Sequence, residues 1–396
     1  MRSLSIVTLF AVVCCTVTFG TVIQRKRSSS NKRIICFYAN WAQYRKGRGR
    51  FLPHQIPADL CTHITYAHLQ VDLTTHELVK RQRNDEFLLK ELVKLKKKNP
   101  ALKIIISVGG WKHEYKPRFS KMVQNERTRA IFIQSVLKWI QKTEVDGLSI
   151  DWEYPTKRGT SGPGDKHRYT LLLKELRAAF DEEERPLTLS ASVSSGRKKI
   201  DTVYEHKKFI KYLDWVNVMA YALHGAWRKF AGHHTTMTGA TNVEDSLNAW
   251  QEKGIPDEKI NLGVATYGRT FTLKDPTNYG LGAPVTNPAH GKPGKYTRIK
   301  GALSYYEFCD QQWDHKIPSY DSKARKPYAS RGDQWIGYES PRSIRSSIAY
   351  LMQKNNNRLG GIAIWKLGYD DFTGTFCHEG KFPLVNAARQ GVYGIA

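Results

Sequence analysis

The segment VDGLSIDWEYP, residues 145–155, carries three acidic residues in apolar and aromatic surroundings. Burying charge there costs free energy unless the charge is paired or does chemistry. Alternate residues of a strand share a face, so Ser149, Asp151 and Glu153 should point the same way, with Glu153 nearest the strand end. A carboxylic acid at that end could protonate a bound molecule. Ser149 stands where the acidic alternation would continue. The segment therefore predicts an acid site, complete or partly lost; the alternative is a carboxylate that only satisfies the core.

Short apolar runs rich in β-branched and aromatic residues recur eight times and predict the strands that would position these groups. They are residues 34–41, 63–71, 103–111, 147–154, 187–195, 215–223, 260–268 and 360–368. Amphipathic helical patterns separate most of them, for example at residues 84–98, 125–142, 165–183 and 340–355. Near-continuous apolar strands are typical of parallel sheets covered on both faces. The pattern predicts an α/β fold, a closed (β/α)₈ TIM barrel.

The alternation of strands and helices is interrupted once, between the seventh and eighth predicted strands. Residues from about 270 to 335 lack a helical period and are rich in Tyr, Gly, Pro and Lys, which predicts a small α+β insertion subdomain beside the cleft. Active sites of such barrels lie at the carboxyl ends of the strands. Aromatic residues that fall at those ends suggest a platform that stacks on sugar rings: Trp41, Trp111, Tyr221, Tyr267 and Trp365.

The first 20 residues have the pattern of a secretory signal peptide, with Arg2, an apolar run over residues 4–17 and an expected cleavage just after Gly20. Residues 21–33 are polar, basic and serine-rich and predict a disordered leader, so the barrel should occupy residues 34–396. No later stretch is long and apolar enough to span a membrane, and we expect a soluble, exported protein.

Four cysteines lie beyond the predicted cleavage point, at Cys36, Cys61, Cys309 and Cys377. An even number in an exported chain indicates two disulfides, and the sequence leaves three pairings open. No pair has C-x-x-C spacing and no histidine cluster accompanies them, so we expect no metal, and nothing suggests an organic cofactor.

Basic residues exceed acidic ones, with 62 Lys and Arg against 36 Asp and Glu, a formal net charge of +26. The basic runs are dispersed, over residues 94–98, 116–121, 195–199 and 323–326. Each run alone is typical of a solvated helix end or loop, but their sum attracts polyanions. An exported chain without a nucleic-acid-binding motif favours an acidic polysaccharide or acidic matrix protein over nucleic acid.

At residues 146–155 the chain resembles the D-G-x-D-x-D-W-E-Y-P signature of family 18 glycoside hydrolases, the chitinases and chitinase-like lectins. The resemblance continues through CFYANWAQYR, SVGGW, NVMAY, GVATYGRTF and GGIAIWKLGYDD, and it is closest to the animal, secreted type. It implies disulfides Cys36–Cys61 and Cys309–Cys377. The carboxy-terminal chitin-binding module of many relatives is absent from this sequence.

The resemblance also implies roles for individual residues. Glu153 would be the proton donor, and the substrate's own N-acetyl carbonyl would attack the anomeric carbon, so no second carboxylate acts as nucleophile. Asp151 and Tyr221 would hold the acetamido group. Substrate-binding positions would be Tyr38, Trp41, Trp111, Met219, Tyr267, Arg269 and Trp365.

Two departures from the family pattern fall on the catalytic parts. Ser149 replaces the aspartate that shares a proton with Asp151, and Ala222 replaces the aspartate that follows Tyr221. His68 stands where phenylalanine is common. We therefore expect a secreted protein of an extracellular matrix, such as a chitinous one, that binds chitin or N-acetylglucosamine oligomers and hydrolyses them weakly or not at all. The alternatives are an active chitinase, since Glu153 is retained, and a basic matrix or signalling protein that binds acidic polymers.

Overall fold

The computed structural model describes residues 32–157, 162–311, 313 and 319–394. In this part of the chain, eight parallel strands close into a barrel in the order β1-β15-β8-β7-β6-β5-β4-β2, and β1 also pairs with β2. The barrel strands are β1 (Arg33–Ala39), β2 (His63–Val71), β4 (Lys103–Gly109), β5 (Gly147–Asp151), β6 (Thr188–Val193), β7 (Trp215–Val218), β8 (Ile260–Ala265) and β15 (Gly361–Trp365). The predicted (β/α)₈ TIM barrel is confirmed.

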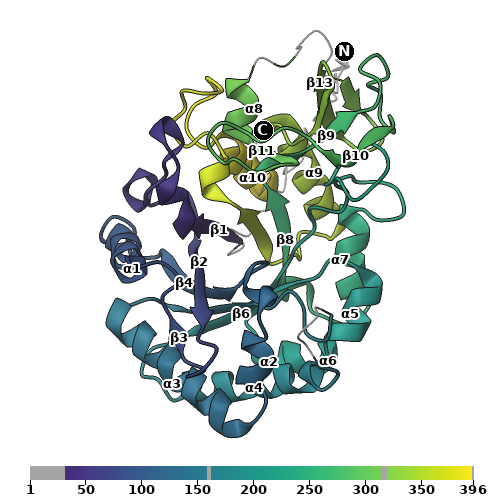
Figure 1. Cartoon of the computed structure of the whole chain (residues 1–396). Helices are drawn as coiled ribbons and strands as arrows, with labels where there is room; N and C mark the ends of the chain where they lie inside the picture. Colours follow the sequence, from purple (N-terminus) through teal and green to yellow (C-terminus); the bar gives the residue numbers. More distant parts are fainter. Residues whose placement is uncertain (1–31, 158–161, 312, 314–318, 395–396) are drawn as a thin grey trace, which may run out of the picture. The chain divides into compact units, whose positions relative to one another are not determined.

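Helices form a layer around these strands (Figure 1). They are α1 (Asp85–Val93), α2 (Arg118–Met122), α3 (Glu126–Thr143), α4 (Asp165–Asp181), α5 (Arg197–Val203), α6 (His206–Phe209), α7 (Val243–Gln251), α9 (Pro341–Lys354) and α10 (Pro383–Tyr393). Their starts follow local chemistry: the Asn125 side chain accepts from the Thr128 backbone N–H to begin α3, and Ser340 does the same before Pro341 in α9. The helix expected over residues 84–98 ends at Val93 and continues as a 3-10 turn, Lys94–Lys97.

Alternation along each strand divides its side chains between two environments. On β5, Leu148 and Ile150 face the helices within the main hydrophobic core, whereas Ser149 and Asp151 belong to the other face, toward the lumen. A separate lumen cluster contains Ile35, Phe37, Ala67, Trp215 and Ala363, with Trp41 and Trp365 packed against it. The strand period therefore sends the chemical groups inward and the bulk of the aliphatic residues outward.

The barrel begins earlier than expected. Arg33 is the first residue of β1, and Lys32 is buried, with its Nζ donating to the Leu359 carbonyl at 2.7 Å. The predicted leader boundary at residue 33 is therefore two residues too late, because both basic side chains find acceptors on the barrel. The predicted signal peptide and the rest of the leader lie outside the described residues.

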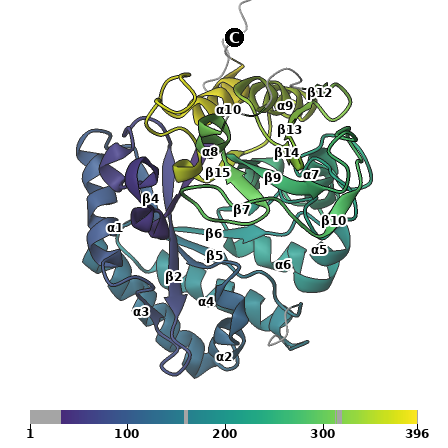
Figure 2. The same ribbon diagram turned by 45° about the horizontal axis from the view of Figure 1, so that its top comes forward.

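A second sheet lies between β8 and β15. Its strands are β9 (Tyr267–Leu273), β10 (Val285–His290), β11 (Ala302–Ser304), β12 (Ser319–Asp321), β13 (Lys326–Arg331) and β14 (Gln334–Gly337), in the order β10-β9-β14-β13-β12 with β11 on β9. With the helix α8 (Tyr305–Asp310), it lies on the same side of the barrel as α9 and α10 (Figures 1 and 2). The sheet starts three residues before the expected position 270, because only Thr266 separates β8 from β9.

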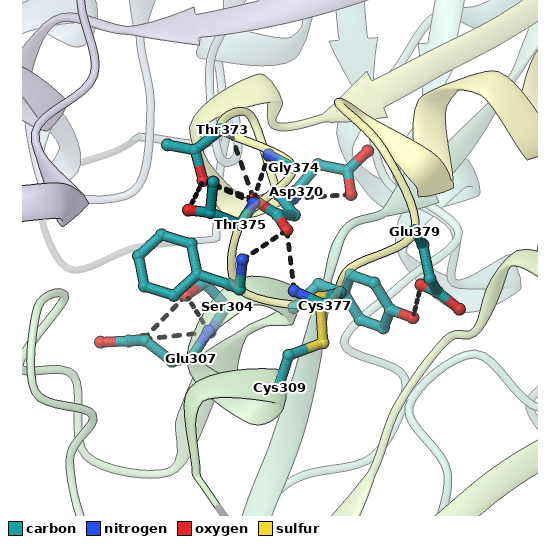
Figure 3. The surroundings of a disulfide bond; sticks show 12 residues. Ser304, Glu307, Cys309, Asp370, Thr373, Gly374, Thr375, Cys377 and Glu379 are labelled. Atoms are coloured by element: carbon teal, nitrogen blue, oxygen red, sulfur yellow. Dashed lines mark hydrogen bonds between the residues drawn. A yellow bond between two sulfur atoms is a disulfide. The ribbon is translucent and has the colours of Figure 1, made fainter.

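Two disulfides join Cys36 to Cys61 and Cys309 to Cys377, the pairings that the resemblance implied. The second links α8 to the loop that follows β15 (Figure 3). Asp371 organises that loop, because its carboxylate accepts from the backbone N–H groups of Gly374, Phe376 and Cys377 at 2.8–2.9 Å. The insertion is therefore tied covalently to the segment after the last barrel strand. No helix among the described residues has the length and apolar character needed to cross a membrane.

Candidate active site

The acid strand, β5 with the residues that follow it, places Ser149, Asp151 and Glu153 one after another toward the mouth of the barrel. Ser149 is fully buried, Asp151 at the end of β5 is 4% exposed, and Glu153 lies two residues beyond the strand and is half-buried. Within the described residues, neither the Ser149 hydroxyl nor Asp151 Oδ1 has a hydrogen-bond partner. The serine hydroxyl thus does not hold Asp151, although its chemistry would allow a hydrogen bond.

Asp146, the first acid of the segment, has a different environment. Its carboxylate pairs with Lys96 Nζ at 2.8 Å and accepts from the Ile104 backbone N–H at 2.8 Å, at the start of β4. It therefore ties the amino-terminal ends of the strands to the helix layer and takes no part in the cleft.

The electrostatics of the lumen favour neutral groups. Burial, together with the charges of Glu153 and Glu114, raises the pKa of Asp151 well above its ordinary value. Burial and the neighbouring Tyr267, Asp151 and Glu153 raise the pKa of Tyr221 well above its ordinary value. Tyr221 therefore remains a phenol that can donate a hydrogen bond to a bound carbonyl.

An aromatic floor crosses the mouth of the barrel. The rings of Trp41 and Trp365 lie 6.4 Å apart between centroids, and Phe37 packs edge-on to Trp365 at 5.3 Å. Trp111, after β4, is 55% exposed. Both Trp41 and Trp365 remain partly exposed, so their faces can contact a ligand.

The expectation for Tyr38 is wrong. Its side chain is fully buried and packs against Phe51 and Tyr66 at 5.6 and 5.8 Å, in the layer between strands and helices. Phe37, one residue earlier on β1, occupies the lumen face instead. The reason is the two-residue period of the strand: Ile35 and Phe37 share a face, and Tyr38 lies on the opposite one.

The opposite wall comes from β7 and β9. Tyr221 meets Tyr267 edge-on at 6.4 Å, and Arg269 lies over the rings of Tyr267 and Trp227 at 5.6 and 5.5 Å. Met219, directly after β7, is half-buried. The structure therefore brings Tyr221, Tyr267 and Arg269 together, and Trp365 packs against the same cluster as the two tyrosines.

Ala222 is held by its backbone. It adopts a left-handed conformation, φ 54°, and its N–H donates to His234 Nδ1 at 3.3 Å. His234 Nε2 in turn donates to the Tyr267 carbonyl at 2.9 Å. The backbone position after Tyr221 is thus fixed, but the methyl group offers no charge or hydrogen bond.

Three residues of the site had no signal, or only a partial one, in the sequence. His234 lies in a polar loop, and only the fold brings it under Ala222. His68 was visible as a departure, but its neighbours were not. Lys366 is 2% exposed, and its Nζ lies 4.1 Å from the ring centroids of both Trp41 and Tyr369. Burial lowers the pKa of Lys366 well below its ordinary value, and the Arg45 charge adds to this.

In the described residues, no three His, Cys, Asp or Glu side chains lie together in a way that could hold a metal ion. The cleft instead combines an acid at the barrel mouth, a buried carboxyl, a neutral phenol and tryptophan faces. Such a set can bind a ring with an apolar face and protonate an oxygen above it.

Comparisons with known proteins agree with this geometry. Mouse chitotriosidase-1 is 40% identical over 375 residues, covering 91% of this chain and 78% of that protein. A solved structure described as an immunomodulatory active chitinase from Trichuris suis superposes with a TM-score of 0.84 at 34% identity, over 91% of this chain and 99% of that one.

A second solved structure is human YKL-39, described as a pseudo-chitinase with retained chitooligosaccharide binding properties. Its TM-score is 0.82 at 32% identity, over 91% of this chain and 99% of that one. The model of the glycosyl hydrolases family 18 matches residues 33–370. The relatives thus include an active chitinase and a pseudo-chitinase, and the chain itself belongs to glycosyl hydrolase family 18.

Proposed function

We propose that the protein binds chitin or N-acetylglucosamine oligomers in this cleft and hydrolyses them weakly or not at all. The observation that carries the proposal is at the acid strand, where Ser149 and Asp151 Oδ1 are buried without a hydrogen-bond partner among the described residues. A carboxyl at position 149 would have shared a proton with Asp151. Serine cannot hold or release one at useful pH.

The proposed roles follow from the chemistry of the reaction. Glu153 would protonate the glycosidic oxygen, and the substrate's acetamido oxygen would attack the anomeric carbon. Asp151 and Tyr221 would press the acetamido group into place and balance its developing positive charge. Because Ala222 stands in place of an aspartate, one side of that charge has no partner. A charged group positioned there is typically worth on the order of a hundredfold in rate.

Sugar binding would use the aromatic and polar rim. Trp365 would be the floor beneath the sugar at the cleavage point, with Trp41 and Trp111 extending the platform. Met219, Tyr267 and Arg269 would line the opposite wall. These side chains need no proton transfer to bind, so affinity can survive the loss of catalysis.

The alternative is a competent chitinase, because Glu153 is retained. Calorimetric titration with chitotetraose and a measurement of chito-oligosaccharide release from chitin separate the two. We expect binding with little release, and Glu153→Gln should leave the affinity unchanged. Rapid release would establish the enzyme, and absence of binding would refute the proposed function.

A basic groove on the outer layer favours a second candidate function, binding of acidic polymers outside the cell. The groove has a volume of about 770 Å³ and is lined by Lys90, Lys94, Lys96, Lys97, Lys142 and Arg185. Five of these six cations pair with Glu86, Glu91 or Asp146, so the groove has six cations against these three acids and the Glu144 of its lining. An extracellular location is supported by the predicted signal peptide and the two disulfides.

Retention on a heparin column tests the groove. Exposed charges are screened over about 8–10 Å at physiological ionic strength, so retention should collapse as salt rises. Changing Lys94, Lys97 and Lys142 together to Gln should lower the eluting salt concentration more than the matched change of Lys198, Lys207 and Lys211 elsewhere. Equal shifts would mean that only net charge matters and that the groove is not a site.

A further inference from the structure

We infer that His68 is a positioning residue that takes the place of the carboxyl missing at position 149 as the proton-sharing partner of Asp151. The inference rests on the proposed function, since it concerns how the same cleft orients its carboxyl toward an N-acetyl sugar. His68 is a histidine at a position where the family commonly has phenylalanine, and the inference gives this difference a role.

The imidazole lies between two partners. His68 Nε2 lies 3.7 Å from Asp151 Oδ2, and Nδ1 lies 3.0 Å from the Ser107 hydroxyl. Both His68 and Asp151 are buried, at 3% and 4% exposure. The gap to Asp151 is longer than a hydrogen bond, and a small rotation of the carboxyl would close it. With the Nδ1 proton donated to Ser107, the lone pair of Nε2 faces Asp151.

The plane of the His68 ring is fixed by the aromatic floor of Trp41 and Trp365. His68 stacks on Trp41 at 6.0 Å and 23°, and on Trp365 at 5.8 Å and 28°. A Cβ on residue 110 would lie 2.7 Å from His68 Nε2, so Gly110 leaves the room that the ring edge needs. The nitrogen is therefore held toward Asp151 by the two tryptophans packed against the ring and by the space that Gly110 leaves at its edge.

The charges around the pair disfavour a permanent ion pair. Burial, and after it the charges of Arg81, Lys366 and His113, which face the imidazole of His68, lower its pKa well below the ordinary value. Glu153 and Glu114 face Asp151 and act in the opposite direction on its carboxyl. The resting pair is a neutral carboxylic acid beside a neutral imidazole.

A bound sugar can change that balance without a change of net charge. When the acetamido nitrogen offers its N–H to Asp151, the Asp151 proton passes from Oδ2 to His68 Nε2. The products are a carboxylate, which can accept that N–H, and an imidazolium, which keeps its Nδ1–H on Ser107. A serine at position 149 could not take this proton.

The first test uses the ligand-free protein and needs no activity. The ¹⁵N chemical shifts of the His68 ring, followed from pH 4 to 9, should change between the unmodified protein and Asp151→Asn. The His63 ring, on the same strand and packed on Trp215 at 5.0 Å, serves as the control and should not respond. A His68 titration indifferent to Asp151→Asn would overturn the inference.

The second test measures chitotetraose binding and residual hydrolysis against pH in His68→Phe and in the control His63→Phe. Coupled groups in contact typically change an equilibrium severalfold. We therefore expect His68→Phe to weaken chitotetraose binding by about tenfold or, in the hydrolysis assay, to lower kcat by about tenfold with KM little changed. The same change should remove the pH dependence of the affinity or of kcat. In a Ser149→Asp background the same change should cost less, because the new acid supplies the partner. Equal costs in both backgrounds would refute the role.

The two failures are distinguishable. If no chito-oligosaccharide binds, the proposed function falls, while the chemical shifts still decide whether His68 and Asp151 share a proton. If His68→Phe lowers the melting temperature markedly, His68→Gln retains a polar side chain and the shift experiment on the unmodified ring stands. Normal pH dependence in both variants would overturn the inference.

Discussion

Restoring the two missing acids, with Ser149→Asp and Ala222→Asp, tests whether the cleft is a catalytic site that has lost parts. Residues 149 and 151 are two positions apart on β5, so their Cα atoms are separated by roughly 7 Å, two strand rises of about 3.3 Å, and two carboxyl side chains there can lean toward one another and lie no farther apart. Two like charges at that distance repel by about 2.4 kcal/mol at an effective dielectric constant of about 20. That energy favours one shared proton over two ionised carboxyls by roughly fiftyfold.

The rate should respond in a non-additive way. Ser149→Asp alone restores proton sharing but leaves the acetamido group poorly held, and Ala222→Asp alone does the reverse. Each positioned charge is worth on the order of a hundredfold, and the double variant should exceed the product of the single gains because the groups act as one unit. Release of a fluorescent group from a chitobioside, with product analysis, measures this.

Two controls accompany the rescue. Glu153→Gln in the double variant should abolish the gain, because it removes the proton donor but keeps the shape. The repulsion between the acids should also lower the free energy of unfolding as pH rises, since a carboxyl whose pKa is raised by folding costs stability above its unfolded pKa. If the unmodified protein already cleaves chitin as fast as the double variant, the reasoning about Ser149 and Ala222 is refuted.

Three further outcomes are expected. Trp365→Ala should reduce chitotetraose affinity measured by calorimetry by at least tenfold, the loss of one stacked ring, whereas Trp139→Ala on α3 should not; equal affinities would remove Trp365 from the floor. Burial raises the pKa of Asp370 from 3.8 to about 7, which is worth about 4 kcal/mol, so the contribution of this group to stability is lost as pH rises from about 4 to about 7; Asp370→Asn should remove that contribution in urea titrations, and an unchanged slope against pH would contradict it. The lowered pKa of Lys366 has the opposite sign, with stability lost as pH falls below the unfolded value, so Lys366→Met should raise the melting temperature at pH 7; a fall would mean that its contacts with the rings outweigh its burial.

The sequence predicted the barrel because hydrophobic periodicity reports burial directly, and each of the eight expected runs overlaps a barrel strand. It also placed Ser149 and Asp151 on one face of the strand, since the alternation of side chains along a strand needs no tertiary information. The prediction failed for Tyr38. Phe37 and Tyr38 are adjacent aromatic residues, and the sequence gave no reason to place the first of them, and not the second, in the lumen.

The rest depended on contacts that no local pattern encodes. Lys366 follows Trp365 and has the sequence context of an ordinary exposed lysine, yet it is buried against the ring of Trp41, from a distant segment, and that of Tyr369, three residues further along the chain. The unpartnered hydroxyl of Ser149 and the approach of His68 to Asp151 likewise arise where β2, β4 and β5 meet, which is a property of the closed barrel.

Barrel closure has a consequence for biosynthesis. β1 hydrogen bonds with β2 on one side and with β15 on the other. A ribosome delivers β2 soon after β1, but β15 begins only at Gly361, so through most of translation the nascent chain carries an unpaired strand edge able to join wrong partners. A chain interrupted before Gly361 would keep every candidate catalytic side chain and still have an open barrel without the Trp365 floor. Messages truncated late should therefore yield chaperone-bound or degraded product, and not a shorter working lectin.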